Sequence, residues 1–200
     1  MYERKKTKLI QGVGINDADY RVGLRSNGVL TWKCPIYVIW GSMLSRCYSP
    51  KYHKEHPTYL DCYVSPAWLR FSEFRKWVVT QNWEGLVLDK DTLTLGNKVY
   101  SEDQCVFIGA ALNSFLTNRK AARGPYPLGV GMWKGRYFAY CNNPFTLRMD
   151  HLGRFSSAEL AHEAWRQRKH QHACTYADMQ TDQRIADALR NRYSIYRENY

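Results

Sequence analysis

The chain has 200 residues, and its 44% hydrophobic and 24% charged residues exclude a disordered protein, because this composition can bury a core. Lys and Arg number 29 against 18 Asp and Glu, so the formal net charge is +11, and 14% of the residues are aromatic. Such a positive excess with many aromatic rings predicts a polyanionic partner, with nucleic acid the first candidate. No uncharged run of eighteen apolar residues is present, so we expect neither a membrane span nor a membrane partner.

The N-terminus and the cysteines indicate the compartment. The first residues, Met-Tyr-Glu-Arg-Lys-Lys, contain no apolar signal core. The cysteines are scattered without a C-x-x-C pair, at Cys34, Cys47, Cys62, Cys105, Cys141 and Cys174. We therefore expect a cytoplasmic protein whose cysteines remain thiols.

The N-terminal third is predicted to hold a basic arm and two helices. Residues 1–34 comprise a basic arm, with four cations before residue 9, and a short extended segment. The arm is either solvated or in contact with DNA. Pro35 opens a predicted helix over 36–48 whose apolar residues have helical spacing. A second helix is predicted to begin at Ser65-Pro66 and to bury one aromatic face. That face consists of Trp68, Phe71, Phe74 and Trp77.

Residues 86–120 predict the order strand, loop, strand, helix. The first strand, 86–88, ends in Asp89-Lys90-Asp91, and a Gly96-Asn97 turn leads to the second strand, 104–108. The helix that follows carries Asn113 near its start. A carboxylate and an amide oxygen suit a hard divalent cation, Mg²⁺ or Mn²⁺, which can stabilise a leaving alkoxide. Asp89 and Asn113 are therefore the candidate metal ligands, although an Asp that ends a strand is usually a turn residue.

The wider pattern resembles the HNH endonucleases of the β-β-α-metal superfamily. The resemblance covers residues 35–123 and rests on motifs that begin with Leu88-Asp89-Lys90-Asp91 and Gly96-Asn97-Lys98-Val99-Tyr100-Ser101 and continue with Gln104-Cys105-Val106-Phe107-Ile108, Asn113 and Asn118-Arg119. An upstream run, Met43-Leu44-x-Arg46-Cys47-Tyr48, is similar to the leader of these modules in tailed phages. The resemblance implies that Asp89 and Asn113 bind the metal. It also implies that Gln104 stands where a middle Asn pins the loop.

Lys90 departs from this family, which usually has a histidine general base directly after the strand-ending Asp. Lysine has a pKa near 10.4, and the flanking carboxylates raise it further, so we expect Lys90 to contact a phosphate or the transition state instead. Some rare-cutting restriction enzymes of the group carry Arg there and use a Tyr and a His from elsewhere. Tyr59, His53 and His56 are the candidates for that replacement. The alternatives, a packed Tyr59 with exposed histidines or a module that only binds, remain open.

A structural zinc site is considered but not favoured. Many HNH modules carry a zinc knuckle made of C-x-x-C pairs, and this sequence has none. Cys47, Cys62, Cys105 and a loop histidine could supply four ligands. Without close spacing, buried free thiols are the preferred interpretation.

Residues 124–175 form a second predicted module, followed by a C-terminal helix within 176–200. Three short strands are expected at 130–133, 136–142 and 147–155, and then a helix with Ser156 as N-cap and Glu159 three residues later. Tyr126-x-x-Gly129-Val130, Lys134-Gly135-Arg136-Tyr137-x-Ala139 and the run from Leu152-Gly153 to Ala164-Trp165 resemble the plant APETALA and ethylene-response-factor DNA-binding domain. The resemblance implies a three-stranded antiparallel sheet backed by a helix, with the sheet face in the major groove.

Charge and alternation point to the same surface. Residues 104–169 hold ten Lys or Arg and only three acids. Alternation along the second strand places Tyr137, Ala139 and Cys141 on one face. We expect the other face to contact DNA, and it carries Arg136, Phe138, Tyr140 and Asn142. Several arginines of the plant domain are replaced here by Gly131, Trp133 and Asn142, so base preference does not follow from the sequence. The candidate DNA contacts are Trp133, Lys134, Arg136, Tyr140, Asn142 and Arg148, with Arg119, Lys120 and Arg123.

Together these patterns predict an α+β protein: an HNH β-β-α-metal module followed by a three-stranded antiparallel sheet packed on a helix. The expected function is a site-preferring endonuclease that hydrolyses double-stranded DNA with a divalent metal, as a free-standing homing endonuclease of a phage in its bacterial host cell. The alternative is a catalytically silent DNA-binding protein or regulator. The sequence leaves both a monomer and a homodimer open.

Overall fold

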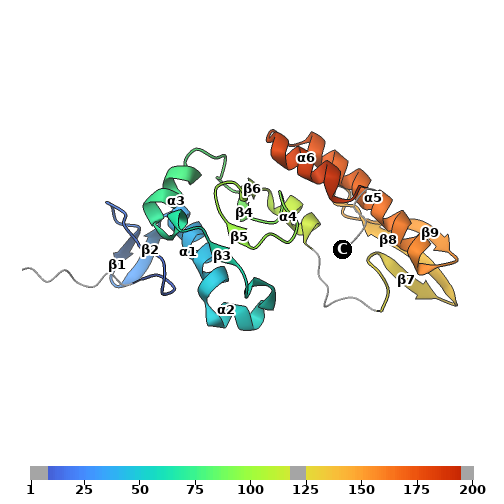
Figure 1. Ribbon diagram of the computed structural model, residues 1–200, viewed down its shortest axis with the longest axis horizontal. Coiled ribbons are helices and arrows are strands. Elements are labelled where there is room, and N and C mark those ends of the chain that lie inside the picture. Colours follow the sequence, from blue (N-terminus) through green and yellow to red (C-terminus); the bar gives the residue numbers. More distant parts are fainter. Residues whose placement is uncertain (1–8, 118–124, 195–200) are drawn as a thin grey trace, which may run out of the picture. The chain divides into compact units, whose positions relative to one another are not determined.

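The computed structural model describes residues 9–117 and 125–194 of an α+β protein (Figure 1). The chain divides into two compact units, Met1–Ile108 and Gly109–Tyr200. The helix that the HNH resemblance assigns to the nuclease module, α4 (Ala110–Leu116), therefore groups with the C-terminal unit. Within the described residues, the model contains no helix with the length and apolar character needed to cross a membrane.

The first unit begins with a hairpin that the sequence interpretation treated as part of an extended segment. Strands β1 (Gly23–Ser26) and β2 (Val29–Lys33) pair antiparallel. Asn27 and Gly28 connect them with φ values of 50° and 79°. Positive φ at both positions is typical of a type I′ turn, for which Asn-Gly is a favoured sequence. The Asn-Gly pair is thus the signal that predicts this hairpin.

The core of the first unit is aromatic and lies between α1 and α3. Trp40 on α1 and Phe71 on α3 are fully buried, with ring centroids 5.5 Å apart. The helix expected from Ser65-Pro66 starts later, because that pair leads into a short 3₁₀ turn and α3 begins only at Phe71. The predicted loop 51–63 likewise contains helical turns. The helical elements of this unit are α1 (Pro35–Tyr48), α2 (Pro50–Glu55), η1 (Pro57–Tyr59), η2 (Ala67–Leu69) and α3 (Phe71–Val78).

Two small sheets complete this unit. The expected pair of strands forms, with β4 (Val87–Asp89) antiparallel to β6 (Val106–Ile108) and Asp89 opposite Val106. A further two-residue strand, β5 (Val99–Tyr100), pairs in parallel with β3 (Tyr63–Val64). This second pairing joins the loop after β4 to the segment after α2, so residues far apart in the sequence meet in this unit.

The second unit contains a three-stranded antiparallel sheet packed against α5, as the sequence predicts (Figure 1). The helix begins one residue later than expected, because Ser157 rather than Ser156 accepts the capping hydrogen bond, from the amide of Leu160. A second helix packs along α5, and Lys169 of α5 donates to the carbonyl of Phe115 at the end of α4. The elements after α4 are β7 (Val130–Trp133), β8 (Arg136–Asn142), β9 (Met149–Phe155), α5 (Ala158–Asp178) and α6 (Gln183–Arg192).

Small residues allow the sheet and α5 to approach closely. Val130, Ala139 and Ala161 form the buried centre of this layer. Gly129 has a φ of +72°, and a Cβ at this position would lie 2.0 Å from the indole of Trp165 on α5. Glycine at 129 is thus required both by the backbone and by the ring that covers it.

Candidate functional site

Asp89 lies half-buried at the end of β4, and its carboxylate organises the turn that follows. Oδ1 accepts hydrogen bonds from the amides of Asp91, at 2.9 Å, and Thr92, at 2.6 Å. It also accepts one from the hydroxyl of Thr92, at 2.6 Å. All three bonds use Oδ1, so the lone pairs of Oδ2 can still bind a cation. Asp89 is a turn residue, and that role leaves one oxygen for the expected metal.

Lys90 is a buried part of the same turn. Its side chain is only 6% exposed, and its ammonium donates to both carboxylate oxygens of Asp91 at 2.9 Å and to the carbonyl of Asn97. Burial disfavours the charged form, but the hydrogen bonds to Asp91 outweigh this effect and raise the pKa of Lys90 above its usual value. Lys90 is therefore unsuited to act as a base, as expected from its sequence context. Its ammonium donors are already engaged, which differs from the phosphate contact that we predicted for it.

Asn97 makes the loop contacts that the family resemblance assigned to Gln104. The side-chain nitrogen Nδ2 of Asn97 donates to the carbonyls of Lys90 and Val99, each at 2.8 Å, and its side-chain oxygen Oδ1 accepts from the backbone amide of Val99 at 3.0 Å. Gln104 lies in the turn before β6, with its backbone amide bonded to the carbonyl of Ser101. Sequence analysis placed Asn97 in a turn but missed this role, because only the folded loop brings residue 97 back to residue 90.

Of the three candidates for the general base, Tyr59 has a contact with this turn. The ammonium of Lys90 is 5.8 Å from the centroid of the Tyr59 ring. Burial raises the pKa of Tyr59, so its phenol holds its proton at neutral pH. His53 contacts the last turn of α1 through Nε2, 2.9 Å from the carbonyl of Arg46. His56 is exposed and lies against the ring of Tyr52.

Asn113 lies in the first half of α4, where its amide and carbonyl join the helical hydrogen bonds. Because α4 belongs to the second unit, the pairing of Asn113 with Asp89 stays a prediction. One carboxylate and one amide oxygen fit Mg²⁺ or Mn²⁺, which keep several waters and bind phosphate oxygens in their remaining positions. The part of the chain that the structure describes contains no group of three or more His, Cys, Asp or Glu that could hold a metal.

The cysteines considered for zinc are buried thiols. Cys47, Cys62 and Cys105 are free and at most 4% exposed. Burial raises the pKa of Cys47 and of Cys105 to about 12. Zinc binds the thiolate, so protonated thiols in an apolar core fit the preferred interpretation of packed side chains.

The sheet of the second unit has two different faces, divided as alternation predicts. Ala139 and Cys141 of β8 are buried on the side of α5. The opposite side is defined here as the outer face, and strand register places cross-strand partners on it together: Trp133 with Arg136, Phe138 with Arg154, Tyr140 with His151 and Asn142 with Met149. Sequence analysis missed His151 and Arg154. A bulge between Ala139 and Tyr140 shifts the β9 register, so simple alternation does not identify them.

The charge of the outer face is positive. Between residues 125 and 157 the sequence has one acid, Asp150, and the strand register puts it opposite Cys141 on the inner side. There its carboxylate lies 3.2 Å from Nε2 of His172 and 3.6 Å from Nε of Arg168. Among the described residues, the outer face therefore presents Arg136, Arg154 and the adjoining Lys134 without an ion pair to a carboxylate.

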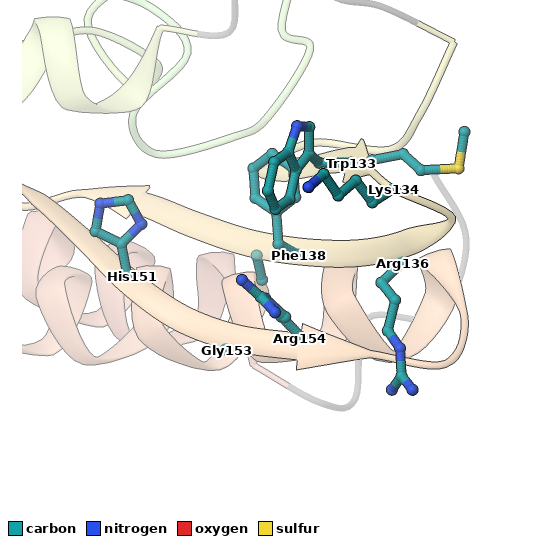
Figure 2. A pocket seen from close by; sticks show the side chains of 9 residues that line it. Trp133, Lys134, Arg136, Phe138, His151, Gly153 and Arg154 are labelled. Atoms are coloured by element: carbon teal, nitrogen blue, oxygen red, sulfur yellow. The ribbon is translucent and has the colours of Figure 1, made fainter.

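A cavity of about 670 Å³ opens on this face (Figure 2). Its lining includes Trp133, Phe138, His151 and Arg154 from the three strands and Lys134 from the turn between β7 and β8. Trp133 is 58% exposed, with the ammonium of Lys134 4.4 Å and the guanidinium carbon of Arg154 6.0 Å from its ring. Cations thus flank an exposed indole inside a hollow of the sheet.

The remaining predicted DNA contacts lie outside this cavity. Tyr140 and Asn142 continue the outer face along β8, and Arg148 is exposed in the connection between β8 and β9. Arg119, Lys120 and Arg123 fall outside the described residues.

Comparisons with protein-family models, with curated proteins and with solved structures found no match for this chain. The two resemblances therefore rest on the sequence motifs alone.

Proposed function

We propose that the protein is a metal-dependent DNA endonuclease of the HNH type that prefers certain sites in duplex DNA. The observation that carries this proposal is the carboxylate of Asp89, fixed at the end of β4 by three hydrogen bonds to Oδ1 while Oδ2 faces no recorded partner among the described residues. A free-standing homing endonuclease of a phage is the kind of enzyme that the motif order suggests.

Each part of the chain has a role in this proposal. Asp89 and Asn113 hold a divalent cation, which when bound supplies Lewis acidity to a phosphodiester oxygen. The turn built by Lys90, Asp91 and Asn97 keeps the carboxylate of Asp89 in place. The outer face of the β7–β9 sheet holds the nucleic acid through its unneutralised cations. His53 and His56 are the preferred candidates for the general base, because Tyr59 keeps its proton and Lys90 is already paired.

The decisive experiment is cleavage of a supercoiled plasmid with Mg²⁺, Mn²⁺ or EDTA. We expect nicking with either metal, none in EDTA, and at least a hundredfold loss for Asp89→Asn. This substitution keeps an oxygen that can accept the three turn hydrogen bonds, so the loop stays folded while the carboxylate charge is lost. Asp103→Asn, at an exposed carboxylate in the turn before β6, is the matched control and should cut at the parental rate. Parental cleavage by Asp89→Asn would place the metal elsewhere.

A second candidate is a DNA-binding protein without catalytic activity. It is favoured by Lys90, since the position of the usual histidine base holds a buried ammonium engaged by Asp91 and Asn97. Plasmid binding without nicking in either metal would support this function over the first.

A further inference from the structure

The cavity on the outer face lies where the strand backbone is lightly covered by side chains. The ring of Phe138 lies over Gly131, where a Cβ would come within 2.3 Å of the ring. Gly153 of β9 lines the cavity with backbone alone. The volume of about 670 Å³ falls within the range of roughly 300–1,000 Å³ typical of small-ligand pockets. The hollow is thus large enough for an aromatic group to enter.

The groups that line it offer flat faces. Trp133 and Phe138 present rings on the same side of the sheet, and Arg154 reaches from β9 towards the indole of Trp133. Carbon atoms in contact are about 3.5–4.0 Å apart, so a planar ring between Trp133 and Arg154 needs a gap of roughly 7 Å. The guanidinium carbon of Arg154 lies 6.0 Å from the centroid of the Trp133 ring. The exposed, flexible Arg154 side chain therefore needs to move by only about 1 Å to admit a planar ring.

A base that is paired in a duplex cannot stack on these flat side-chain faces. Paired bases stack on their neighbours and show only their edges in the grooves, whereas unpaired bases expose the faces that stack on aromatic rings and guanidinium planes. Lys134 and Arg136 lie at the turn beside the cavity, within reach of the phosphates of the same strand. We propose that this cavity binds an unpaired base of a DNA strand, stacked between Trp133 and Arg154. The inference rests on the proposed DNA binding by this face and names the form of DNA that fits the cavity.

The test measures binding of the full chain, in EDTA, by fluorescence anisotropy. The probes are a labelled single DNA strand, its duplex, the RNA strand of the same sequence and a DNA strand with abasic sites in its middle. The abasic strand keeps every phosphate and lacks the stacking faces. We expect the single DNA strand to bind about 5- to 150-fold more tightly than the abasic strand, which is the range for stacking one base on an aromatic side chain.

Two variants locate the effect. Trp133→Ala should remove most of the difference between the intact and abasic strands, and Arg154→Lys, which keeps the charge but loses the plane, should reduce it. Trp32→Ala, at a tryptophan of β2 that is 43% exposed, is the matched control and should leave it unchanged.

The outcomes separate this inference from the proposed function. Equal affinity for the intact and abasic strands, or no effect of Trp133→Ala, overturns the inference, while duplex binding would still support the proposed function. Tighter binding of the RNA strand overturns the assignment to DNA. Absence of binding to every probe overturns both proposals.

Discussion

The ammonium of Lys90 shows how folding can give a residue a different role from the one its sequence context suggests. Its neighbours in sequence suggested a cation available to a phosphate, but folding turns it inward between Asp91 and Asn97. Lys90 therefore stabilises the loop that carries Asp89. If the proposed nuclease function holds, a base for water has to come from another residue, and His53 and His56 are the histidine candidates.

Lys90→Met tests this structural role. The substitution leaves the carboxylate of Asp91 and the carbonyl of Asn97 without their buried donor, so we expect the free energy of unfolding to fall by about 1–3 kcal/mol. Urea denaturation measures the change, with Lys51→Met, at an exposed lysine of α2, as a control expected within ~0.5 kcal/mol of the parent. A variant that is fully stable but binds DNA less tightly would instead identify Lys90 as a phosphate contact.

At the scale of elements, tight turns and close contacts between the sheet and α5 fix the positions of the strands. The Lys134-Gly135 turn joins β7 to β8 with positive φ at both residues, 49° and 74°. Gly129 shares this kind of backbone conformation but lies under the Trp165 ring. Substitutions at these two glycines therefore distinguish the energetic cost of a strained backbone from the cost of a side-chain collision.

Gly129→Ala and Gly135→Ala form a matched pair. Both place a side chain at positive φ, which costs roughly 1–2 kcal/mol, but only the methyl group at 129 collides with an indole, whereas position 135 has open space. We expect Gly129→Ala to lower the free energy of unfolding by at least about 1 kcal/mol more than Gly135→Ala, since overpacking typically costs about 1–3 kcal/mol. Equal losses would show that α5 does not pack over Gly129 as described.

At the scale of the whole molecule, the positive charge is distributed unevenly. The only acid between residues 125 and 157 is Asp150, which is paired on the inner side of the sheet, so the outer face retains its cations. If this surface binds a polyanion as we propose, binding releases counterions, and the affinity then depends on the salt concentration.

The salt dependence of duplex binding measures this effect on the full chain in EDTA. The logarithm of the affinity should fall linearly with that of the salt concentration, with a slope of about −0.9 for each phosphate neutralised. Arg148→Ala should make the slope shallower by roughly one unit if Arg148 contacts a phosphate. Arg190→Ala removes a cation paired with Asp178 at 2.7 Å and should leave the slope unchanged. If the slope is flat in the parent protein, the outer face does not bind DNA through phosphates.

The sequence by itself determined the elements whose signals are local. Apolar periodicity predicted α1, strand alternation predicted the two faces of β8, and the apolar run before Asp89 predicted that this residue lies at the end of a strand. These features depend on neighbouring residues and on repeating geometry, which a sequence displays directly.

Only the tertiary structure decided which residues far apart in the sequence contact each other. The loop that returns Asn97 to Lys90 and the bulge that brings His151 and Arg154 onto the outer face depend on how distant segments meet. The cavity beside Trp133 likewise depends on which residues the three strands bring together, and no local pattern in the sequence encodes that.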